Sequence, residues 1–316
     1  MLNVKNLNVY CFQNATKKYL LKDITFLLKK GESLGIIGKS GSGKSTLAKA
    51  LLKIYENNIY YEKGEIILND IPFNSSFRGK KISLLFQNPN SYLNPLMKVG
   101  KQISEMLVYH YKERKKVAKA KAIEFMKKFG LKEAEKIYNY YPHEISGGMQ
   151  QKICLCISLI CNPEVLILDE STSFLDAETK EEILKLIKDI QKESKFSLIM
   201  ISHDFKEIYS VCDKIAIMRN GSMIEFGNKK EIILKPIHPH TIELLLDYLR
   251  YYKNIERFNC PTLNIELVES APITMISDTH YVRSWFLDKL SPKINFPKNI
   301  TQLKEEIYEN IRNKQP

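Results

Sequence analysis

The chain has 316 residues and a formal net charge of +12, with 48 Lys and Arg against 36 Asp and Glu. Hydrophobic residues make up 44% of the sequence and charged residues 27%, which excludes wholesale disorder, collagen and a coiled coil. The longest apolar stretch, residues 153–168, contains Asn162, Pro163 and Glu164 and is too interrupted for a membrane-spanning helix. The N-terminus lacks the pattern of a secretion signal, so we expect a cytoplasmic location.

Two further features of composition narrow the class of protein. The six cysteines are scattered along the chain, so we expect free thiols and no disulfide scaffold. Cys154, Cys156 and Cys161 lie in an apolar run, where buried packing is favoured over a metal site. The excess positive charge is mostly lysine interspersed with acidic residues, which favours a generally solvated surface over a nucleic-acid-binding face.

In the first part of the chain the sequence predicts two strands, and after them a buried strand, a loop and a helix. Alternating apolar residues predict β-strands at residues 2–12 and 24–28. A buried strand at 34–37 is followed by a glycine-rich loop at 38–43 and by a helix at 45–55, where apolar residues recur at helical spacing.

The middle of the chain predicts a helical insertion between strand-rich parts. Further strands are predicted at residues 65–68 and 82–86, and helical periodicity extends over 99–130, where Gly130 ends it. A second helix is predicted at 152–161, where Asn162-Pro163 stops it.

The next part alternates strand and helix. Apolar runs at 165–168 and 197–201 predict buried parallel strands, with a helix capped by Asp176 between them, which indicates an α/β sheet. Asn220-Gly221 predicts a hairpin. Beyond residue 236 the pattern weakens and prolines interrupt it, so we place a boundary there.

A glycine-rich segment fits the phosphate-binding P-loop pattern, with the residues Gly38, Lys39, Ser40, Gly41, Ser42, Gly43, Lys44 and Ser45. Glycines allow backbone N–H groups to surround a phosphate at the positive end of the following helix. Lys44 is expected to reach the β- and γ-phosphates and Ser45 to bind Mg²⁺, while Thr46 begins the helix.

Two acids follow the predicted strand at 165–168. Asp169 suits Mg²⁺, and Glu170 is placed to polarise an attacking water. Together with the P-loop, this pair predicts nucleotide hydrolysis rather than storage.

Four segments, which follow one another along the chain as they do in the family, resemble motifs of the ATP-binding cassette (ABC) ATPases. Ile145-Ser146-Gly147-Gly148-Met149-Gln150-Gln151 resembles the signature motif, Phe86-Gln87 the Q-loop, Ser173-Phe174-Leu175-Asp176 the D-loop, and Ile201-Ser202-His203-Asp204 the switch histidine. The resemblance implies an α/β P-loop NTPase fold with a RecA-like parallel-sheet core and an antiparallel β subdomain. It also implies a nucleotide-binding domain at 1–235, with a helical signature subdomain at about 88–160, and a small C-terminal extension at 236–316.

The resemblance further implies ATP and Mg²⁺ as ligands and a site shared by two ATPase subunits, head to tail. ATP would lie on one subunit and be covered by the signature loop of the other, where Ser146, Gly147 and Gly148 face the γ-phosphate. Closure of the two subunits would exclude water and complete the site.

Three other residues have implied roles in that shared site. His203 would contact the γ-phosphate and hold the attacking water, and Asp176 would link the two sites across the interface. Gln87 would join the metal and catalytic site and, with the helical insertion, pass the change to a membrane subunit.

Three more segments resemble ATPases of oligopeptide, dipeptide and nickel importers, namely Phe86 to Pro95, Tyr141 to Glu144 and His238 to Thr241. The implied partners are a second ATPase, identical or paralogous, two integral membrane permeases and, indirectly, an extracytoplasmic binding protein. The protein would lie peripherally at the cytoplasmic face of the membrane, with peptide somewhat favoured over nickel as the transported substrate.

The alternative is a soluble ABC ATPase acting on nucleic acid or ribosomes. The single cassette and the absence of a basic block argue against it, so we expect no nucleic-acid partner.

Three details of the resemblance concern the C-terminal extension and the adenine site. The C-terminal extension often carries several cysteines that resemble an iron–sulfur site, but Cys260 stands alone here and Ser284 replaces another, so no iron–sulfur cluster is expected. An aromatic residue near the first strand is expected to stack on adenine; Tyr10, Phe12 and Tyr19 are candidates, with Phe12 preferred. The extension is either a packing appendage or a dimer or regulatory contact.

Overall fold

A mixed β-sheet forms the centre of the computed structural model, which describes residues 1–55, 58–86, 92–253 and 273–283. Within these ranges its strand order is β11-β12-β10-β9-β3-β8-β7-β6. The five strands from β9 to β6 are parallel, and β10, β12 and β11 continue the sheet antiparallel. The bounds are β3 (Ser33–Ile37), β6 (Ile82–Leu85), β7 (Val165–Asp169), β8 (Ser197–Ile201), β9 (Lys214–Arg219), β10 (Ser222–Asn228), β11 (Ile273–Ser277) and β12 (His280–Arg283).

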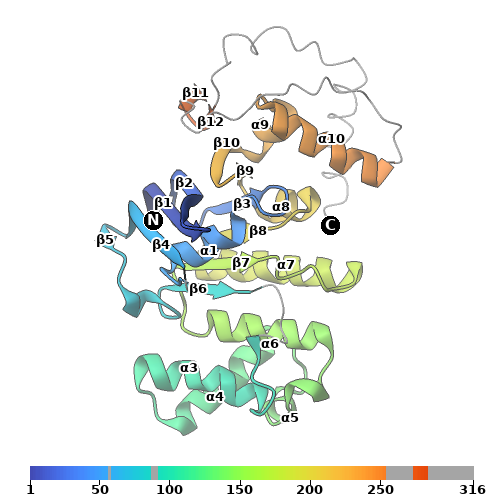
Figure 1. Cartoon of the computed structure of the whole chain (residues 1–316). Coiled ribbons are helices and arrows are strands. Elements are labelled where there is room, and N and C mark those ends of the chain that lie inside the picture. The colour runs from blue at the N-terminus through green and yellow to red at the C-terminus, as the bar shows by residue number, and fades with distance from the viewer. Residues whose placement is uncertain (56–57, 87–91, 254–272, 284–316) are drawn as a thin grey trace.

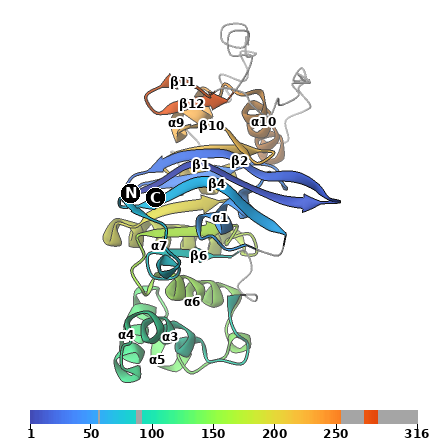
Figure 2. The same ribbon diagram turned by 60° about the vertical axis from the view of Figure 1, so that its left-hand side comes forward.

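A second, antiparallel sheet lies beside the first and has the order β2-β1-β4-β5. Its long strands extend beyond the central sheet as a curved ribbon (Figure 2). The bounds are β1 (Leu2–Gln13), β2 (Thr16–Leu28), β4 (Ile59–Leu68) and β5 (Ile71–Pro72). This sheet is the expected antiparallel β subdomain.

Helices cover the central sheet and form a separate layer at the β6 side (Figure 1). That layer contains α3 (Val99–Tyr111), α4 (Lys115–Lys128), α5 (Ala134–Ile137) and α6 (Gly147–Leu159), with a short 3₁₀ turn at Pro142–Glu144. Another 3₁₀ turn, Ser75–Phe77, stands between β5 and β6 in the chain, and Phe77 packs in the core of the antiparallel sheet. The other helices are α1 (Lys44–Leu51), α7 (Ala177–Ser194), α8 (Phe205–Val211), α9 (Lys229–Leu234) and α10 (Pro239–Lys253). No helix of the described ranges has the length and apolar character needed to cross a membrane.

Strand β7 begins with four apolar residues, and its packing shows why. Leu166 and Leu168 belong to the core that contains the helical layer, whereas Val165 and Ile167 belong to the core beneath α1 and the antiparallel sheet. A parallel strand that is covered on both faces is apolar along most of its length. The predictions of buried strands at 34–37, 165–168 and 197–201 are therefore confirmed.

Other local predictions are also confirmed, with some changes of boundary. Asn220-Gly221 joins β9 to β10, and both residues have positive φ, as a tight hairpin turn requires. The helical insertion at 99–130 is divided into α3 and α4, because Lys112 ends α3 in a left-handed conformation. The strand predicted at 65–68 is longer in the structure, where it begins at Ile59.

Cysteine packing agrees with the sequence. Cys154, Cys156, Cys161 and Cys212 are buried free thiols, and Cys11 is half-buried. Burial raises the pKa of the Cys154 thiol to about 12, which makes this thiol a packing residue. Cys260 and Ser284 lie outside the described residues.

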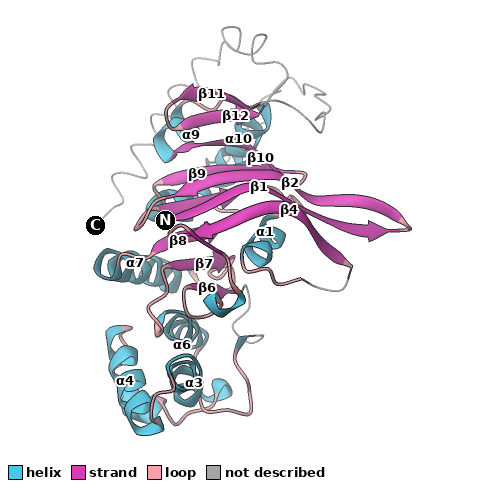
Figure 3. Cartoon of the chain, turned by 90° about the vertical axis from the view of Figure 1, so that its left-hand side faces the viewer, coloured by secondary structure: helices cyan, strands magenta, loops and turns pink. Residues whose placement is uncertain are grey.

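The described part of the C-terminal extension packs onto the cassette. Strand β12 pairs with β10, and Tyr281 stacks on Phe226 with ring centroids 5.1 Å apart. Fully buried Glu225 accepts hydrogen bonds from the backbone N–H groups of Ile237 and His238 and contacts His280 Nε2 at 2.8 Å. Figure 3 shows β12 continuing the sheet beyond β10. The division at residue 235 stays a prediction.

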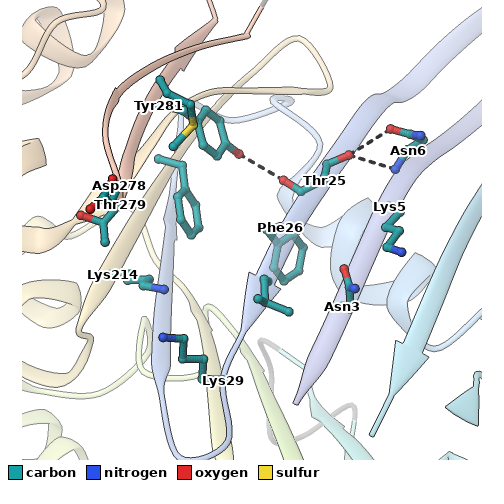
Figure 4. A pocket seen from close by; sticks show the side chains of 13 residues that line it. Asn3, Lys5, Asn6, Thr25, Phe26, Lys29, Lys214, Asp278, Thr279 and Tyr281 are labelled. Atoms are coloured by element: carbon teal, nitrogen blue, oxygen red, sulfur yellow. Dashed lines mark hydrogen bonds between the residues drawn. The ribbon is translucent and has the colours of Figure 1, made fainter. Parts of the chain in front are cut away.

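A cavity of about 550 Å³ lies between the antiparallel sheet and the β11–β12 hairpin. Figure 4 shows Tyr281 pointing toward Thr25, whose carbonyl oxygen accepts a hydrogen bond from the Tyr281 hydroxyl at 3.2 Å. Lys29 and Lys214 lie at another wall of this cavity. It contains none of the predicted site residues, so it is separate from the site described next.

Candidate functional site

The predicted P-loop connects the end of β3 to the start of α1. Lys44, the first residue of α1, is 6% exposed. Its ammonium group donates hydrogen bonds to the carbonyl oxygens of Gly38 at 2.8 Å and Lys39 at 3.2 Å. Burial lowers the pKa of Lys44, and the nearby carboxylates of Glu170 and Asp169 act in the opposite direction. The loop therefore curves around a buried positive charge.

Two glycines make this curvature possible. Gly43 has a φ of 101°, which side-chain-bearing residues rarely adopt. A Cβ atom on Gly38 would lie 2.4 Å from the carbonyl oxygen of Met218. Both positions require glycine for the loop to close against β9 and β2.

The loop also offers polar groups to a ligand. The buried Ser42 hydroxyl has no hydrogen-bond partner within the described ranges, and a Cβ atom on Gly41 would meet nothing within 4 Å. A buried polar group without a partner is costly unless a ligand or water satisfies it. The loop thus fits a phosphate group at the start of α1.

Ser45 and Asp169 lie in contact at the other side of the loop. Ser45 Oγ, from α1, donates to Asp169 Oδ1, at the end of β7, over 3.1 Å. Burial raises the pKa of Asp169, and the Ser45 hydrogen bond partly opposes that effect. A hydroxyl beside a carboxylate is a donor set that suits Mg²⁺.

Glu170 and His203 follow neighbouring strands. Asp169 of β7 is in register with Ile201 of β8. Glu170 donates its backbone N–H to Ile201 over 3.0 Å, with a left-handed φ of 46°. His203 follows two residues after Ile201 and is exposed. The adjacent strands β3, β8 and β7 therefore bring the P-loop, His203 and Glu170 to one edge of the sheet.

The signature residues form a second, exposed group. Ser146 caps α6 and accepts a hydrogen bond from the Met149 N–H over 3.3 Å, and Gly147 has open space around it. A Cβ atom on Gly148 would lie 2.9 Å from a methyl group of Thr179, in the first turn of α7. Thr179 in turn donates its N–H to Asp176, over 2.9 Å, and this bond lowers the pKa of Asp176.

The arrangement around Ser146 and Asp176 is the exposed N-terminus of α6, held next to the D-loop. Such a surface suits an anion presented from outside the chain. Gln87, the predicted Q-loop residue, lies outside the described residues.

The preferred adenine-stacking residue, Phe12, is 49% exposed. It contacts Tyr10 and Tyr60, with ring centroids 5.5 and 5.6 Å away, and Tyr19 lies 6.3 Å from Tyr10. All three candidates therefore belong to one aromatic cluster on the antiparallel sheet.

The pairing of β1 with β2 relates this aromatic cluster to the P-loop. Val9 pairs with Leu21, and the Leu21 side chain lies against Gly43 of the P-loop. The pairing of β1 with β2 shifts register between Val9 and Tyr10, so the alternation of side chains cannot be counted from Val9 to Phe12. Adenine stacking by Phe12 stays a prediction.

One contact of the P-loop was missed from the sequence. Lys39 Nζ forms an ion pair with Glu243 of α10 at 2.7 Å. The two residues are far apart in the chain, and no local pattern marks either as a partner of the other.

Comparison with known proteins places this geometry in a family. The chain is 35% identical to the oligopeptide transport ATP-binding protein OppD of Bacillus subtilis (strain 168), over 95% of this chain and 92% of the relative. The chain belongs to the ABC transporter family. The profile of that family, "ABC transporter", matches residues 21–173.

Further relatives agree. The oligopeptide transport ATP-binding protein AmiE of Streptococcus pneumoniae serotype 4 is 34% identical, over 92% of this chain and 90% of the relative. The dipeptide transport ATP-binding protein DppD of Lactococcus lactis is 33% identical, with 95% of each covered.

Solved structures match the fold. The ATP-binding cassette MJ0796, dimeric and bound to ADP and Pi, superposes with a TM-score of 0.64 at 26% identity, over 72% of this chain and 99% of that one. The cbiO1 protein of Clostridium perfringens, part of the ABC transporter complex cbiONQ, gives 0.63 at 26% identity, over 80% and 98%. This ABC ATPase therefore has the expected P-loop fold, binds ATP and couples ATP hydrolysis to transport.

Proposed function

We propose that this ABC ATPase energises an importer for oligopeptides or dipeptides, at the cytoplasmic face of the membrane. The observation that carries the substrate class is the similarity to OppD, AmiE and DppD, which extends over more than nine-tenths of this chain. The partners would be a second ATPase, identical or paralogous, two permeases and, indirectly, an extracytoplasmic binding protein. The names of these three relatives favour peptide over nickel.

ATP would bind with its phosphates in the P-loop. Lys44 now donates to two loop carbonyl groups, and a β- or γ-phosphate oxygen is a stronger acceptor for an ammonium group. The N–H groups at the start of α1 and the Ser42 hydroxyl would complete the cradle. Lys44 therefore exchanges intramolecular partners for the substrate.

Ser45 and Asp169 would hold Mg²⁺, since their oxygens already lie 3.1 Å apart. Gln87 is the third proposed ligand. When bound, the metal neutralises negative charge on the β- and γ-phosphates.

Glu170 would accept a hydrogen bond from the attacking water and polarise it. The water oxygen forms a bond to the γ-phosphorus as the bond from that phosphorus to the β–γ bridging oxygen breaks, which gives ADP and inorganic phosphate. His203 would hydrogen-bond the γ-phosphate and keep the water in line. Both side chains come from the sheet edge that carries the P-loop.

A second subunit would complete the site. Ser146, Gly147 and Gly148 are on the surface formed by α6 and the D-loop, and Asp176 lies beside them. The similarity to the dimeric MJ0796 cassette supports a pair of subunits. In the proposed head-to-tail pair, this surface would cover ATP on the other subunit.

The first test is hydrolysis by wild type and Glu170→Gln. We expect Glu170→Gln to bind ATP with wild-type affinity and to release phosphate at least about a hundredfold more slowly. Equal rates would remove Glu170 from the proposed role.

The transport role needs a separate test. Tagged Glu170→Gln protein, expressed in its native host and held with ATP in mild detergent, should co-purify with two integral membrane proteins and a second ATPase. Deletion of the gene should abolish uptake of a labelled tri- or tetrapeptide and spare nickel uptake. Ribosomal proteins or nucleic acid in place of permeases would overturn the proposal and favour the soluble alternative.

A further inference from the structure

A buried carboxylate lies behind the catalytic edge of the sheet. Glu207, in the first turn of α8, is 5% exposed. Its Oε2 atom accepts hydrogen bonds from Thr172 Oγ1 over 3.0 Å and from Ser202 Oγ over 2.8 Å. Its Oε1 atom lies 2.6 Å from Lys180 Nζ of α7. The side chain thus joins three separate segments of the chain.

A buried charge at position 207 costs desolvation free energy unless other groups compensate it. The neighbouring residues Phe205, Ile208 and Val211 of α8 are buried apolar side chains, and an apolar residue at 207 would satisfy a packing role alone. A buried carboxylate is tolerated where hydrogen bonds and an opposite charge compensate its desolvation. Glu207 has both, so its partners explain why a charge is accommodated here.

The two hydroxyl residues that hydrogen-bond Glu207 lie close in sequence to Glu170 and His203. Thr172, which is 1% exposed, follows Glu170 by two residues, and Ser202, 3% exposed, immediately precedes His203. Ser202 Oγ also accepts the backbone N–H of Asp204 over 3.0 Å, so its hydrogen bonds fix both sides of His203.

Lys180, the ion-pair partner of Glu207, links this carboxylate to the D-loop. It lies in the first turns of α7, the helix that Asp176 caps, and its backbone N–H donates to the Asp176 carbonyl over 2.9 Å. One carboxylate therefore contacts the loop after β7, the loop after β8 and the helix that begins at the D-loop.

We propose that Glu207 is a positioning residue for ATP hydrolysis, which holds the segments bearing Glu170 and His203 in a fixed relation. Two groups that act on one water and one phosphate lose rate steeply when their relative position shifts by about 1 Å. Glu207 acts through Thr172 and Ser202, and through Lys180 it ties this geometry to the D-loop. The inference rests on the roles proposed above for Glu170 and His203.

The sharpest variants keep the carboxylate and remove one donor each. Thr172→Val retains the shape of the side chain, and Ser202→Ala removes one hydroxyl, while the Lys180 pair stays intact in both. In the full-length protein, assembled as it is for the wild-type assay, we expect kcat to fall about tenfold in each. KM and the affinity for ATP in EDTA should stay within about twofold of wild type, because the phosphate-binding loop is untouched.

Conservative replacements and a matched control separate positioning from stability. Thr172→Ser keeps the hydroxyl and should retain most of the wild-type kcat. Ser33→Ala removes a comparable hydroxyl, 1% exposed, which donates to Asp213 over 2.6 Å at the opposite end of β3. We expect Ser33→Ala to lower the Tm at least as much as Ser202→Ala and to leave kcat unchanged.

Two outcomes would overturn the proposal. One is wild-type kcat in both Thr172→Val and Ser202→Ala; the other is a loss of kcat in Ser33→Ala equal to that in Ser202→Ala, which would mean that lowered stability explains both. Glu170→Gln is assayed alongside. A fully active Glu170→Gln would contradict the catalytic assignment, whereas an inactive Glu170→Gln beside fully active Thr172 and Ser202 variants would contradict the role of Glu207 alone.

Discussion

Glu243 of α10 and Lys39 of the P-loop form an ion pair, with 2.7 Å between Oε1 and Nζ. The second oxygen of Glu243 lies 2.9 Å from Nδ1 of buried His240. The carbonyl oxygen of Lys39 accepts a hydrogen bond from Lys44, so α10 contacts the loop that surrounds the phosphate site. The C-terminal segment therefore places a negative charge next to a site for an anion.

We expect Glu243→Gln to tighten ATP binding about two- to fivefold. The substitution removes a carboxylate that repels phosphate and leaves the Lys39 ammonium group free to attract it. Both side chains of the pair are about half exposed, so the loss of stability should stay below about 1 kcal/mol. The measurement is ATP affinity in EDTA at low and high salt, and the gain should shrink as salt rises.

The control is Glu181→Gln, since Glu181 pairs with Lys206 at the same 2.7 Å on an exposed surface. It should leave ATP affinity unchanged. Unchanged or weaker ATP binding in Glu243→Gln would show that the ion pair does not oppose the nucleotide.

Ser45→Ala should raise the Mg²⁺ concentration needed for half-maximal hydrolysis by about tenfold or more. The variant removes the hydroxyl that lies beside Asp169 and leaves Lys44 and the loop in place. Titration of Mg²⁺ at fixed ATP measures the shift, and ATP affinity in EDTA serves as the internal control. An unshifted Mg²⁺ titration would exclude Ser45 as a ligand.

The Mg²⁺ affinity should also fall on acidification sooner than an ordinary aspartate would predict. Burial raises the pKa of Asp169, so its protonated form persists to higher pH than in the unfolded chain. Protonation in the folded state then favours the fold as pH falls, but it competes with Mg²⁺. The stabilisation of the ATP-bound protein by Mg²⁺, measured as a difference in Tm, should be complete above the raised pKa and lost below it. In Asp169→Asn that difference should be small at every pH.

Replacement of His280 by alanine should lower stability, whereas replacement of His203 by alanine should lower activity. His280 is 3% exposed and contacts buried Glu225 at 2.8 Å, so His280→Ala should lower the free energy of unfolding by about 2 kcal/mol. His203 is exposed, so His203→Ala should leave the Tm within a degree or two and abolish most hydrolysis. Thermal melts and phosphate release on the same samples test both; equal melting temperatures for the two variants would contradict the buried role of His280.

Much of the site could be predicted because its chemistry is carried by short segments. The loop at 38–45, the acids after β7 and Asp176 at the start of α7 all depend on local backbone geometry. The strands that carry them are covered on both faces and are therefore apolar along most of their length. These patterns are visible without knowledge of the fold.

The missed contacts are those between distant segments. Glu207 lies in a short helix among polar and apolar neighbours, where an acid is typical of a solvated surface. Its burial becomes evident only when β7, β8 and α7 are assembled around it. The pairing of β12 with β10 likewise depends on a strand separated from its partner by a long stretch of chain.

The addition of β12 to β10 has a practical consequence for shortened versions of the protein. A chain ended at residue 235 would lack Ile237, His238 and His280, the groups that hydrogen-bond Glu225. It would also leave the outer backbone of β10 open to pairing with other molecules. We therefore expect the isolated cassette to self-associate through this open strand edge, although its sequence retains every residue proposed to bind ATP.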